Sequence, residues 1–292
     1  MHFNMKVAIY GKKYKEEHKE YLETLLSKLE SMDCFIFMFE DYAAQTQRDY
    51  KTYNSHQELK AIDPDLMVTL GGDGTILAVT SLIRDINLPI LGINLGRLGF
   101  LASTEKNKIN IALDAWISKN YRIEERTMIS VSSNIPIFQN NNVALNDFTL
   151  LKRDTSSMIK VHAYINDEFL NSYWADGLIV STPTGSTGYS LSCGGPIIFP
   201  TSGNLAITPV APHNLNVRPI VVPDDSVIKF NIEGRSEHFL CTIDSRFETV
   251  TEEHEITVQR SELTTKLLFL PEIEFMNTIR QKLSWGFDKR NI

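Results

Sequence analysis

A short run of glycines around one acid and one hydroxyl is the part of this sequence best suited to chemistry. The run occupies residues 71–75, Gly-Gly-Asp-Gly-Thr, and directly follows the apolar stretch 66–70. Glycines let backbone N–H groups approach a ligand closely. Residues 76–86 have the pattern of a helix, so the run lies at a helix N-terminus, where free N–H groups and the helix dipole favour phosphate oxygens. We therefore expect a phosphate-binding loop.

The acid of this loop, Asp73, needs a separate explanation because a carboxylate repels phosphate. It could hold Mg²⁺, or it could take a proton from an attacking hydroxyl group. The alternative is a simple strand-to-helix turn in which Asp73 caps the helix. The motif is short enough to occur by chance, so the loop alone leaves these options open.

A second cluster of polar residues lies between Ser181 and Ser192, where seven residues are Ser or Thr. Hydroxyl groups and glycines at this density can form a hydrogen-bonding surface for a flat polar ligand, and Tyr189 could stack on such a ligand. The alternative is a Ser/Thr-rich turn between two strands.

Alternating strands and helices surround the glycine run. Apolar stretches predict strands at 6–10, 34–39, 66–70 and 89–93. Helical spacing predicts helices at 15–32, 76–86 and 110–119, while 42–59 could be a helix or a loop. This order indicates a parallel sheet with helices on its faces. Ligands bind beyond the carboxyl ends of such strands, where Asp73 and Asn94 are expected.

The character of the chain changes near residue 122. Short, partly alternating segments separated by turn residues predict a sandwich or compact antiparallel assembly. These strands are predicted at 128–132, 142–151, 158–165, 178–181, 227–232, 239–243, 255–259 and 267–269. Residues 273–283 predict a helix that packs back on the first domain. The expected domains are therefore 1–122 (α/β, nucleotide-binding), 123–270 (β-rich) and the C-terminal helix 271–292.

Bulk composition narrows the function classes. The formal net charge of −7 argues against nucleic acid as the partner. No apolar run approaches the roughly 18 residues of a membrane span, and no signal peptide is recognised. Three scattered cysteines and seven histidines show no metal-ligand spacing, so no metal ligands are assigned. We expect a cytoplasmic protein with reduced thiols.

These motifs, in this order, resemble those of the bacterial NAD kinases. The matching segments are 70–75, 92–100, 145–147, 176–196, 211–213 and 218–219. The Gly-Gly-Asp-Gly-Thr loop also resembles the loops of diacylglycerol and sphingosine kinases and of phosphofructokinases. The Ser-Thr-Pro-Thr-Gly-Ser-Thr run that begins at Ser181 is far more specific to NAD kinases.

The resemblance implies an α/β Rossmann-like N-terminal domain and a β-rich, sandwich-like C-terminal domain, with NAD between them. It implies a homodimer or homotetramer that completes the pocket. It also implies transfer of the γ-phosphoryl group of ATP to the 2′-hydroxyl of the adenosine ribose of NAD. Mg²⁺ or another divalent cation would bridge the ATP oxygens. Some members of the family use polyphosphate, and the choice between NAD and NADH stays open.

The resemblance also implies roles for individual residues. Asp73 would be the base, and Gly72, Gly74 and Thr75 would hold phosphate. Asn146 would contact the adenine and Asp147 the ribose. The remaining residues implied for NAD are Thr187, Gly188, Tyr189 and Ser192 on the adenine side, Ser190 and Leu191 in the same segment, Asp176 at the nicotinamide half, Ala211 from a neighbouring subunit, and Arg246.

The chain departs from the family pattern at four positions. The usual Asn-Glu is Asn146-Asp147, which shortens the carboxylate by one methylene group. Gly188 replaces an alanine, and Trp174 stands where many members have arginine. Arg246 follows Asp244-Ser245 where glutamine is common, so its role rests on position alone.

Two other functions are compatible with part of this pattern. A lipid kinase could share the Asp73 loop, but residues 142–196 offer a polar surface where an acyl chain needs an apolar one. A non-catalytic NAD(P)-binding regulator could keep the fold, but an intact Asp73 argues against it.

Overall fold

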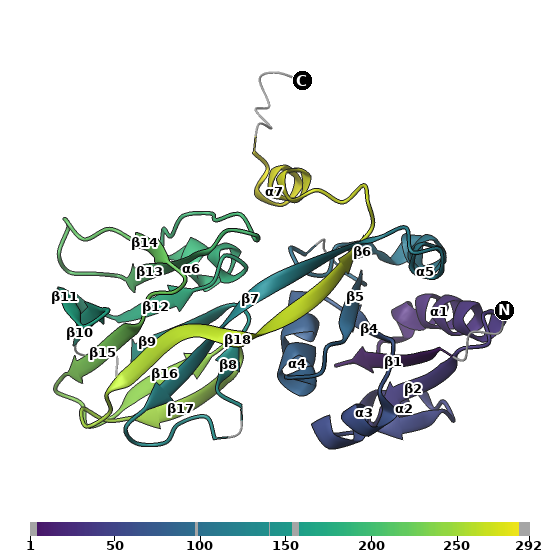
Figure 1. Cartoon of the computed structure of the whole chain (residues 1–292), viewed down its shortest axis with the longest axis horizontal. Helices are drawn as coiled ribbons and strands as arrows, with labels where there is room; N and C mark the ends of the chain where they lie inside the picture. Colours follow the sequence, from purple (N-terminus) through teal and green to yellow (C-terminus); the bar gives the residue numbers. More distant parts are fainter. Residues whose placement is uncertain (1–4, 97–98, 140, 154–157, 286–292) are drawn as a thin grey trace. The chain divides into compact units, whose positions relative to one another are not determined.

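The computed structural model describes residues 5–96, 99–139, 141–153 and 158–285 (Figure 1). The chain divides into two compact units, Met1–Glu125 with Thr265–Ile292 and Arg126–Thr264. Two long strands, β7 (Arg122–Ser133) and β18 (Ile256–Phe269), contain residues of both units. The domain limits expected at residues 122 and 270 stay predictions. No helix among the described residues is long and apolar enough to span a membrane.

The first unit contains a parallel sheet with the strand order β3-β2-β1-β4-β5, followed by the end of β18. Its strands are β1 (Lys6–Gly11), β2 (Phe35–Phe39), β3 (Lys51–Tyr53), β4 (Leu66–Gly71), β5 (Pro89–Asn94) and β6 (Thr104–Glu105). β1, β4 and β5 are buried almost throughout because helices cover the sheet, which explains their continuous apolar sequences. The predicted parallel sheet is confirmed.

The helices of this unit are α1 (Lys19–Ser31), α2 (Glu40–Thr46), α3 (His56–Ile62), α4 (Asp73–Ile83), α5 (Ile109–Ile117) and α7 (Phe275–Leu283). α1 buries Leu22, Leu25, Leu26 and Leu29, the stripe that predicted it. Residues 42–59, for which the sequence left helix or loop undecided, contain most of α2, the short strand β3 and part of α3. The helix predicted at 76–86 begins three residues earlier, at Asp73, and ends at Ile83.

The second unit is a β-sandwich. Its six-stranded antiparallel sheet has the order β14-β13-β12-β9-β16-β17. These strands are β9 (Asp147–Lys152), β12 (Gly177–Ser181), β13 (Asn204–Val210), β14 (Ile220–Pro223), β16 (Phe239–Ile243) and β17 (Arg246–Val250). The facing strands include β8 (Val143–Ala144), β10 (Ile159–Ile165), β11 (Glu168–Ala175), β15 (Ile228–Glu233) and the first part of β18. One hydrophobic core fills the space between them, with Phe148 and Phe230 stacked at 6.0 Å between ring centroids.

The fold class is confirmed, but several strands differ from expectation. β11, β13, β14 and β17 were not predicted, and the two strands expected at 255–259 and 267–269 are one strand, β18. The strand expected at 142–151 is interrupted between β8 and β9 by Leu145 and Asn146. This interruption places Asn146 in a tight turn of the second unit.

Candidate active site

The glycine loop joins β4 to α4 and leaves its backbone open to a ligand. Gly72 occupies the cap position of α4 in an extended conformation, and its carbonyl accepts the Thr75 N–H at 2.9 Å. A methyl group added at Gly72 or Gly74 would meet no atom of the described residues within 4 Å, so both positions are open on that part of the chain. Thr75 is buried, and its hydroxyl packs against Gly71. Gly72 and Gly74 are therefore the residues of this loop that a phosphate group can approach.

The Asp73 carboxylate is held by three backbone N–H groups from the segment after β5. Its Oδ2 accepts from Phe100 at 2.8 Å, and its Oδ1 accepts from Leu101 at 3.0 Å and Ala102 at 2.9 Å. Gly72 is the cap residue of α4, and no side chain of the described residues caps this helix, so Asp73 is not the helix cap of the alternative interpretation. Asp73 is only partly exposed, and its carboxylate has one fixed orientation at the entrance to the glycine loop.

The segment that holds Asp73 is shaped by its own close contacts. Asn94, at the end of β5, is buried; its Oδ1 accepts the Gly96 N–H at 2.8 Å and its Nδ2 donates to the Ala102 carbonyl at 3.0 Å. Gly99 packs so tightly on Asp73 that a methyl group there would lie 1.9 Å from Oδ1. Asn94 lies at the carboxyl end of β5, where the sequence predicted it. Its hydrogen bonds to Gly96 and Ala102 shape the segment whose N–H groups hold Asp73. The sequence places one basic residue in this segment, Arg97, which could bind phosphate or form a surface ion pair, and it lies outside the described residues.

In the second unit, Asn146 and Asp147 are held in place by a carboxylate that the sequence did not single out. Asp244, in the turn between β16 and β17, accepts the N–H of Leu145 at 2.9 Å, of Asn146 at 2.8 Å and of Asp147 at 3.4 Å. The Asp244 N–H donates back to the Asp147 carbonyl at 3.1 Å. The two turns therefore fix each other.

Asp147 and Asp244 form a buried pair of carboxyl groups. Burial and the neighbouring charge of Asp244 raise the pKa of Asp147 to about 7. Burial also raises the pKa of Asp244, although its backbone N–H donors and Arg246 act in the opposite direction. At least one carboxyl group of this turn can therefore change its protonation state near neutral pH.

Replacing Asp147 with asparagine is expected to stabilise the protein more at pH 8 than at pH 5. The folded-state pKa of Asp147 lies above its ordinary value, so the unfolded chain releases this proton first as the pH rises from about 4 to 7. Over that range the carboxyl group lowers the free energy of unfolding, by roughly 4 kcal/mol at most. Asparagine does not titrate, so in the variant the free energy of unfolding no longer falls for this reason. Urea unfolding of both proteins at pH 5 and pH 8 measures the difference, and an equal difference at both values would contradict the assignment.

The Ser/Thr-rich segment uses several of its hydroxyl groups internally. Thr182 Oγ1 donates to the Leu145 carbonyl at 2.6 Å, and Ser186 Oγ donates to the Pro183 carbonyl at the same distance. Thr187 Oγ1 bonds to the Thr184 carbonyl at 3.1 Å, and Ser190 Oγ lies 2.9 Å from Thr208 Oγ1. These hydrogen bonds shape the segment, which forms a 3-10 turn followed by the short helix α6 (Tyr189–Ser192).

The end of this segment lies beside the Asn146 turn. A methyl group at Gly188 would lie 3.5 Å from Asn146 Nδ2 and 3.7 Å from Asp147 Oδ2. Tyr189 follows with 40% of its surface exposed, so its ring is free to contact a ligand. Leu191 is half-buried and Ser192 is exposed. The structure thus brings Asn146, Asp147 and Gly188 together.

Three other predicted residues have partners of their own. The carboxylate of Asp176 pairs with Lys152 at 2.6 Å. The Asp176 N–H bonds to the Val210 carbonyl at 2.9 Å, which places Ala211 one residue beyond this contact. Ala211 is exposed, with a φ of 44°. The Arg246 guanidinium donates to the backbone carbonyls of Asn141 and Val143, so it braces the chain before β8.

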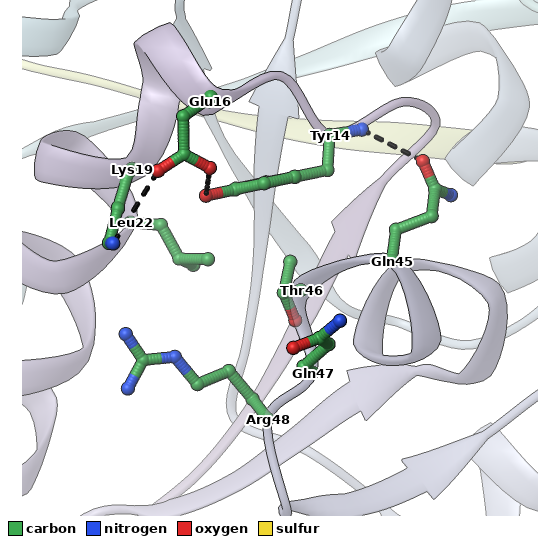
Figure 2. Close-up of a pocket in the computed structure, with 8 residues that line it drawn as sticks. All are labelled: Tyr14, Glu16, Lys19, Leu22, Gln45, Thr46, Gln47 and Arg48. Atoms are coloured by element: carbon green, nitrogen blue, oxygen red, sulfur yellow. Dashed lines mark hydrogen bonds and ion pairs between the residues drawn. The ribbon is translucent and has the colours of Figure 1, made fainter.

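A cavity of about 350 Å³ lies elsewhere in the first unit, and no predicted site residue lines it. Figure 2 shows its polar lining, in which Lys19 pairs with Glu16 at 3.4 Å and the Tyr14 hydroxyl donates to Glu16 at 3.2 Å. Arg48 pairs with Glu23 at 2.8 Å. Because its charged groups have partners within the protein, the cavity adds nothing to the candidate site.

The first unit combines a parallel α/β sheet with a fixed carboxylate in a glycine-rich loop, and the second unit is an antiparallel β-sandwich. This arrangement suits a phosphotransferase that acts on an alcohol group. Two family models match the chain: the ATP-NAD kinase N-terminal domain over residues 7–121 and the ATP-NAD kinase C-terminal domain over residues 145–270. The chain belongs to the NAD kinase family.

Relatives cover the full length of the chain. It is 46% identical to the NAD kinase of Cytophaga hutchinsonii, over 97% of this chain and 99% of the relative, and 42% identical to that of Flavobacterium psychrophilum, over 98% and 100%. Among solved structures, yeast NADH kinase complexed with NADH matches with a TM-score of 0.86 and 26% identity, covering 97% of this chain and 89% of that one. An NAD kinase from Archaeoglobus fulgidus in complex with ATP matches with a TM-score of 0.77 and 25% identity, covering 96% and 99%. These comparisons do not support a lipid kinase or a non-catalytic regulator.

Proposed function

We propose that this NAD kinase transfers the γ-phosphoryl group of ATP to the 2′-hydroxyl of the adenosine ribose of NAD, with Asp73 as the general base. The observation that carries the assignment of Asp73 is the orientation of its carboxylate. Three backbone N–H groups hold it beside Gly72 and Gly74, whose backbones are open to phosphate.

In this reaction the 2′-oxygen forms a bond to the γ-phosphorus, and the bond from that phosphorus to the bridging oxygen of ADP breaks. The hydroxyl proton passes to Asp73, and the products are NADP and ADP. Phosphoryl transfer depends mainly on positioning and charge stabilisation. Asp73 orients the hydroxyl and accepts its proton, while the backbone at Gly72 and Gly74 holds phosphate oxygens at the start of α4. Thr75, whose N–H bonds to the Gly72 carbonyl, shapes this loop.

For the adenosine part of NAD we assign the turn and the short helix of the second unit. Asn146 contacts the adenine and Asp147 the ribose, and the closeness of Gly188 to both supports the grouping. Tyr189 offers an exposed ring for stacking. The further residues assigned to NAD are Leu191, Ser192, Asp176 and Ala211, while Thr187, Ser190 and Arg246 belong to the same proposed site. Because Thr187, Ser190 and Arg246 have internal partners, we assign them a shaping role.

A divalent cation fits this site as a companion of ATP. Among the described residues no group of three or more His, Cys, Asp or Glu side chains could hold a metal ion. The Asp73 oxygens already accept three N–H groups. Mg²⁺ is commonly held through substrate phosphates, waters and one or two carboxylates. When bound, such a cation neutralises charge on the phosphate oxygens.

We also propose a homodimer or homotetramer in the cytoplasm, with the domains divided at residues 122 and 270. The free thiols of Cys34, Cys193 and Cys241 fit a reducing compartment. Size-exclusion chromatography with light scattering measures the oligomeric state.

One activity matrix tests the proposed function. Purified protein is incubated with ATP or polyphosphate as donor and with NAD, NADH or diacylglycerol as acceptor, in the presence of Mg²⁺. NADP or NADPH formation is the expected result. Phosphorylated lipid, or no phosphorylated product with any pair, would contradict the proposal.

A further inference from the structure

The C-terminal helix brings a lysine to the candidate base. Lys282, in the last turn of α7, has its Nζ 3.6 Å from Asp73 Oδ2 and 4.6 Å from the centre of the Phe100 ring. About a third of its side chain is exposed. The ammonium group therefore lies beside the glycine loop and remains accessible.

Contacts within the first unit fix α7 in this place. Thr278 and Ile279 are buried, and the rings of Phe275 and Phe100 lie 6.3 Å apart. The segment before the helix is anchored because Arg122 donates to the Ile273 carbonyl at 2.8 Å. Lys282 is thus delivered by a packed helix.

The ion pair between Lys282 and Asp73 contributes little to the stability of the protein. Its 3.6 Å separation exceeds the length of a hydrogen bond, and a partly exposed pair stabilises a protein little. Three N–H groups already orient the carboxylate without Lys282. In the described part of the chain no hydrogen-bond acceptor holds its ammonium group, so its donors are available to another anion.

We propose that Lys282 binds the γ-phosphate of ATP and offsets the repulsion between that phosphate and Asp73. This inference rests on the proposed function, because it takes ATP as the donor at the glycine loop. Gly72 and Gly74, which flank Asp73 in the chain, have open backbones, so phosphate oxygens can come close to the carboxylate that Lys282 pairs with. When phosphate binds, the ammonium group donates to its oxygens and leaves Oδ2 of Asp73 to the attacking hydroxyl. During transfer the same group stabilises charge on the equatorial oxygens.

The test compares Lys282→Met and Lys282→Arg with the control Arg280→Met, which changes a cation of the same helix whose partner is Asn277. Equilibrium binding is measured for a non-hydrolysable ATP analogue, AMP and NAD. Lys282→Met should bind the ATP analogue about tenfold more weakly, which is the loss of one charge-assisted hydrogen bond. AMP and NAD binding should stay within about twofold, since neither places a γ-phosphate at Lys282. Lys282→Arg should recover most of the affinity, and Arg280→Met should match the unaltered protein.

Two results would overturn the inference. One is unchanged affinity of Lys282→Met for the ATP analogue. The other is a higher kcat in Lys282→Met, which would make the lysine a restraint on Asp73. Thermal melting and NAD binding show whether Lys282→Met is folded. If it is not, the affinities of Lys282→Arg and Lys282→Gln for the ATP analogue are compared instead. If the unaltered protein makes no NADP but Lys282→Met still loses ATP-analogue affinity, the proposed function fails and the phosphate contact stands.

Discussion

Replacing Asp73 with asparagine is expected to lower kcat about a thousandfold while NAD binding changes little, because general-base catalysis contributes roughly 10²- to 10⁴-fold. The amide has almost the shape of the carboxylate, but it cannot take the proton of the 2′-hydroxyl. One of its two ends also becomes a donor, so one N–H of the 100–102 segment loses its acceptor. The loss of turnover therefore has two causes, the missing base and the loss of one hydrogen bond between residue 73 and the 100–102 segment.

Kinetics and calorimetry together separate these two effects. We would measure kcat, the dissociation constant of NAD and the melting temperature, with Asp49→Asn as a control because Asp49 is an exposed acid of the same unit. A parallel loss of NAD binding and melting temperature would assign Asp73 a structural role. Turnover close to that of the unaltered protein would exclude it as the base.

Replacing Gly99 with alanine is expected to lower kcat about a hundredfold, although Gly99 is not assigned any contact with substrate. The added methyl carbon would lie 1.9 Å from Asp73 Oδ1 and 2.7 Å from its Cγ, so the carboxylate or the loop has to move. A displacement of about 1 Å at a reacting group can cost this much. The steady-state rate with saturating ATP and NAD measures the effect.

Gly96→Ala is the matched control for this substitution. Gly96 lies in the same segment, but among the described residues the nearest atom to a methyl group there would be Asn94 Oδ1 at 4.0 Å. The account requires a much larger loss for Gly99→Ala than for Gly96→Ala. Equal losses would mean that the segment tolerates no side chain for reasons unrelated to Asp73.

The glycine loop could be predicted from the sequence because its parts are contiguous. An apolar strand, three glycines and a helix start follow one another within residues 66–76, and local physics fixes that order. The carboxylate's partners could not be predicted, because Phe100, Leu101 and Ala102 are 27 to 29 positions away and contribute only backbone N–H groups. The only local signal was the pair of glycines at 96 and 99, which indicates that the backbone of this segment packs closely against another group.

Two further features of the site depend on pairing across long stretches of sequence. Asp244 meets the Asn146 turn across 98 positions, and Lys282 reaches Asp73 from the last helix. No spacing rule connects residues so far apart. The Ser/Thr-rich segment shows that composition alone can mislead about the role of a side chain. Its hydroxyl groups predicted a ligand-binding surface, but those of Thr182, Ser186 and Ser190 form hydrogen bonds within the protein.

The unpredicted strands also have a physical explanation. β17 has the sequence Arg-Phe-Glu-Thr-Val, in which the alternation of polar and apolar residues stops at Thr249, and Phe247 in this edge strand is 71% exposed. β13 contains Pro209 near its end, and proline usually argues against a paired strand. Their pairing with neighbouring strands provides the stability that their own sequences do not indicate.

The position of the new phosphate ester decides whether this protein phosphorylates the 2′-hydroxyl of NAD with Asp73 as the base. The protein is incubated with ATP, Mg²⁺ and NAD, and the product is examined by ³¹P NMR and compared with authentic NADP. We expect a single monoester at the 2′-oxygen of the adenosine ribose, absent when Asp73→Asn replaces the unaltered protein over the same time. An ester at another hydroxyl group, or no ester at all, would contradict it.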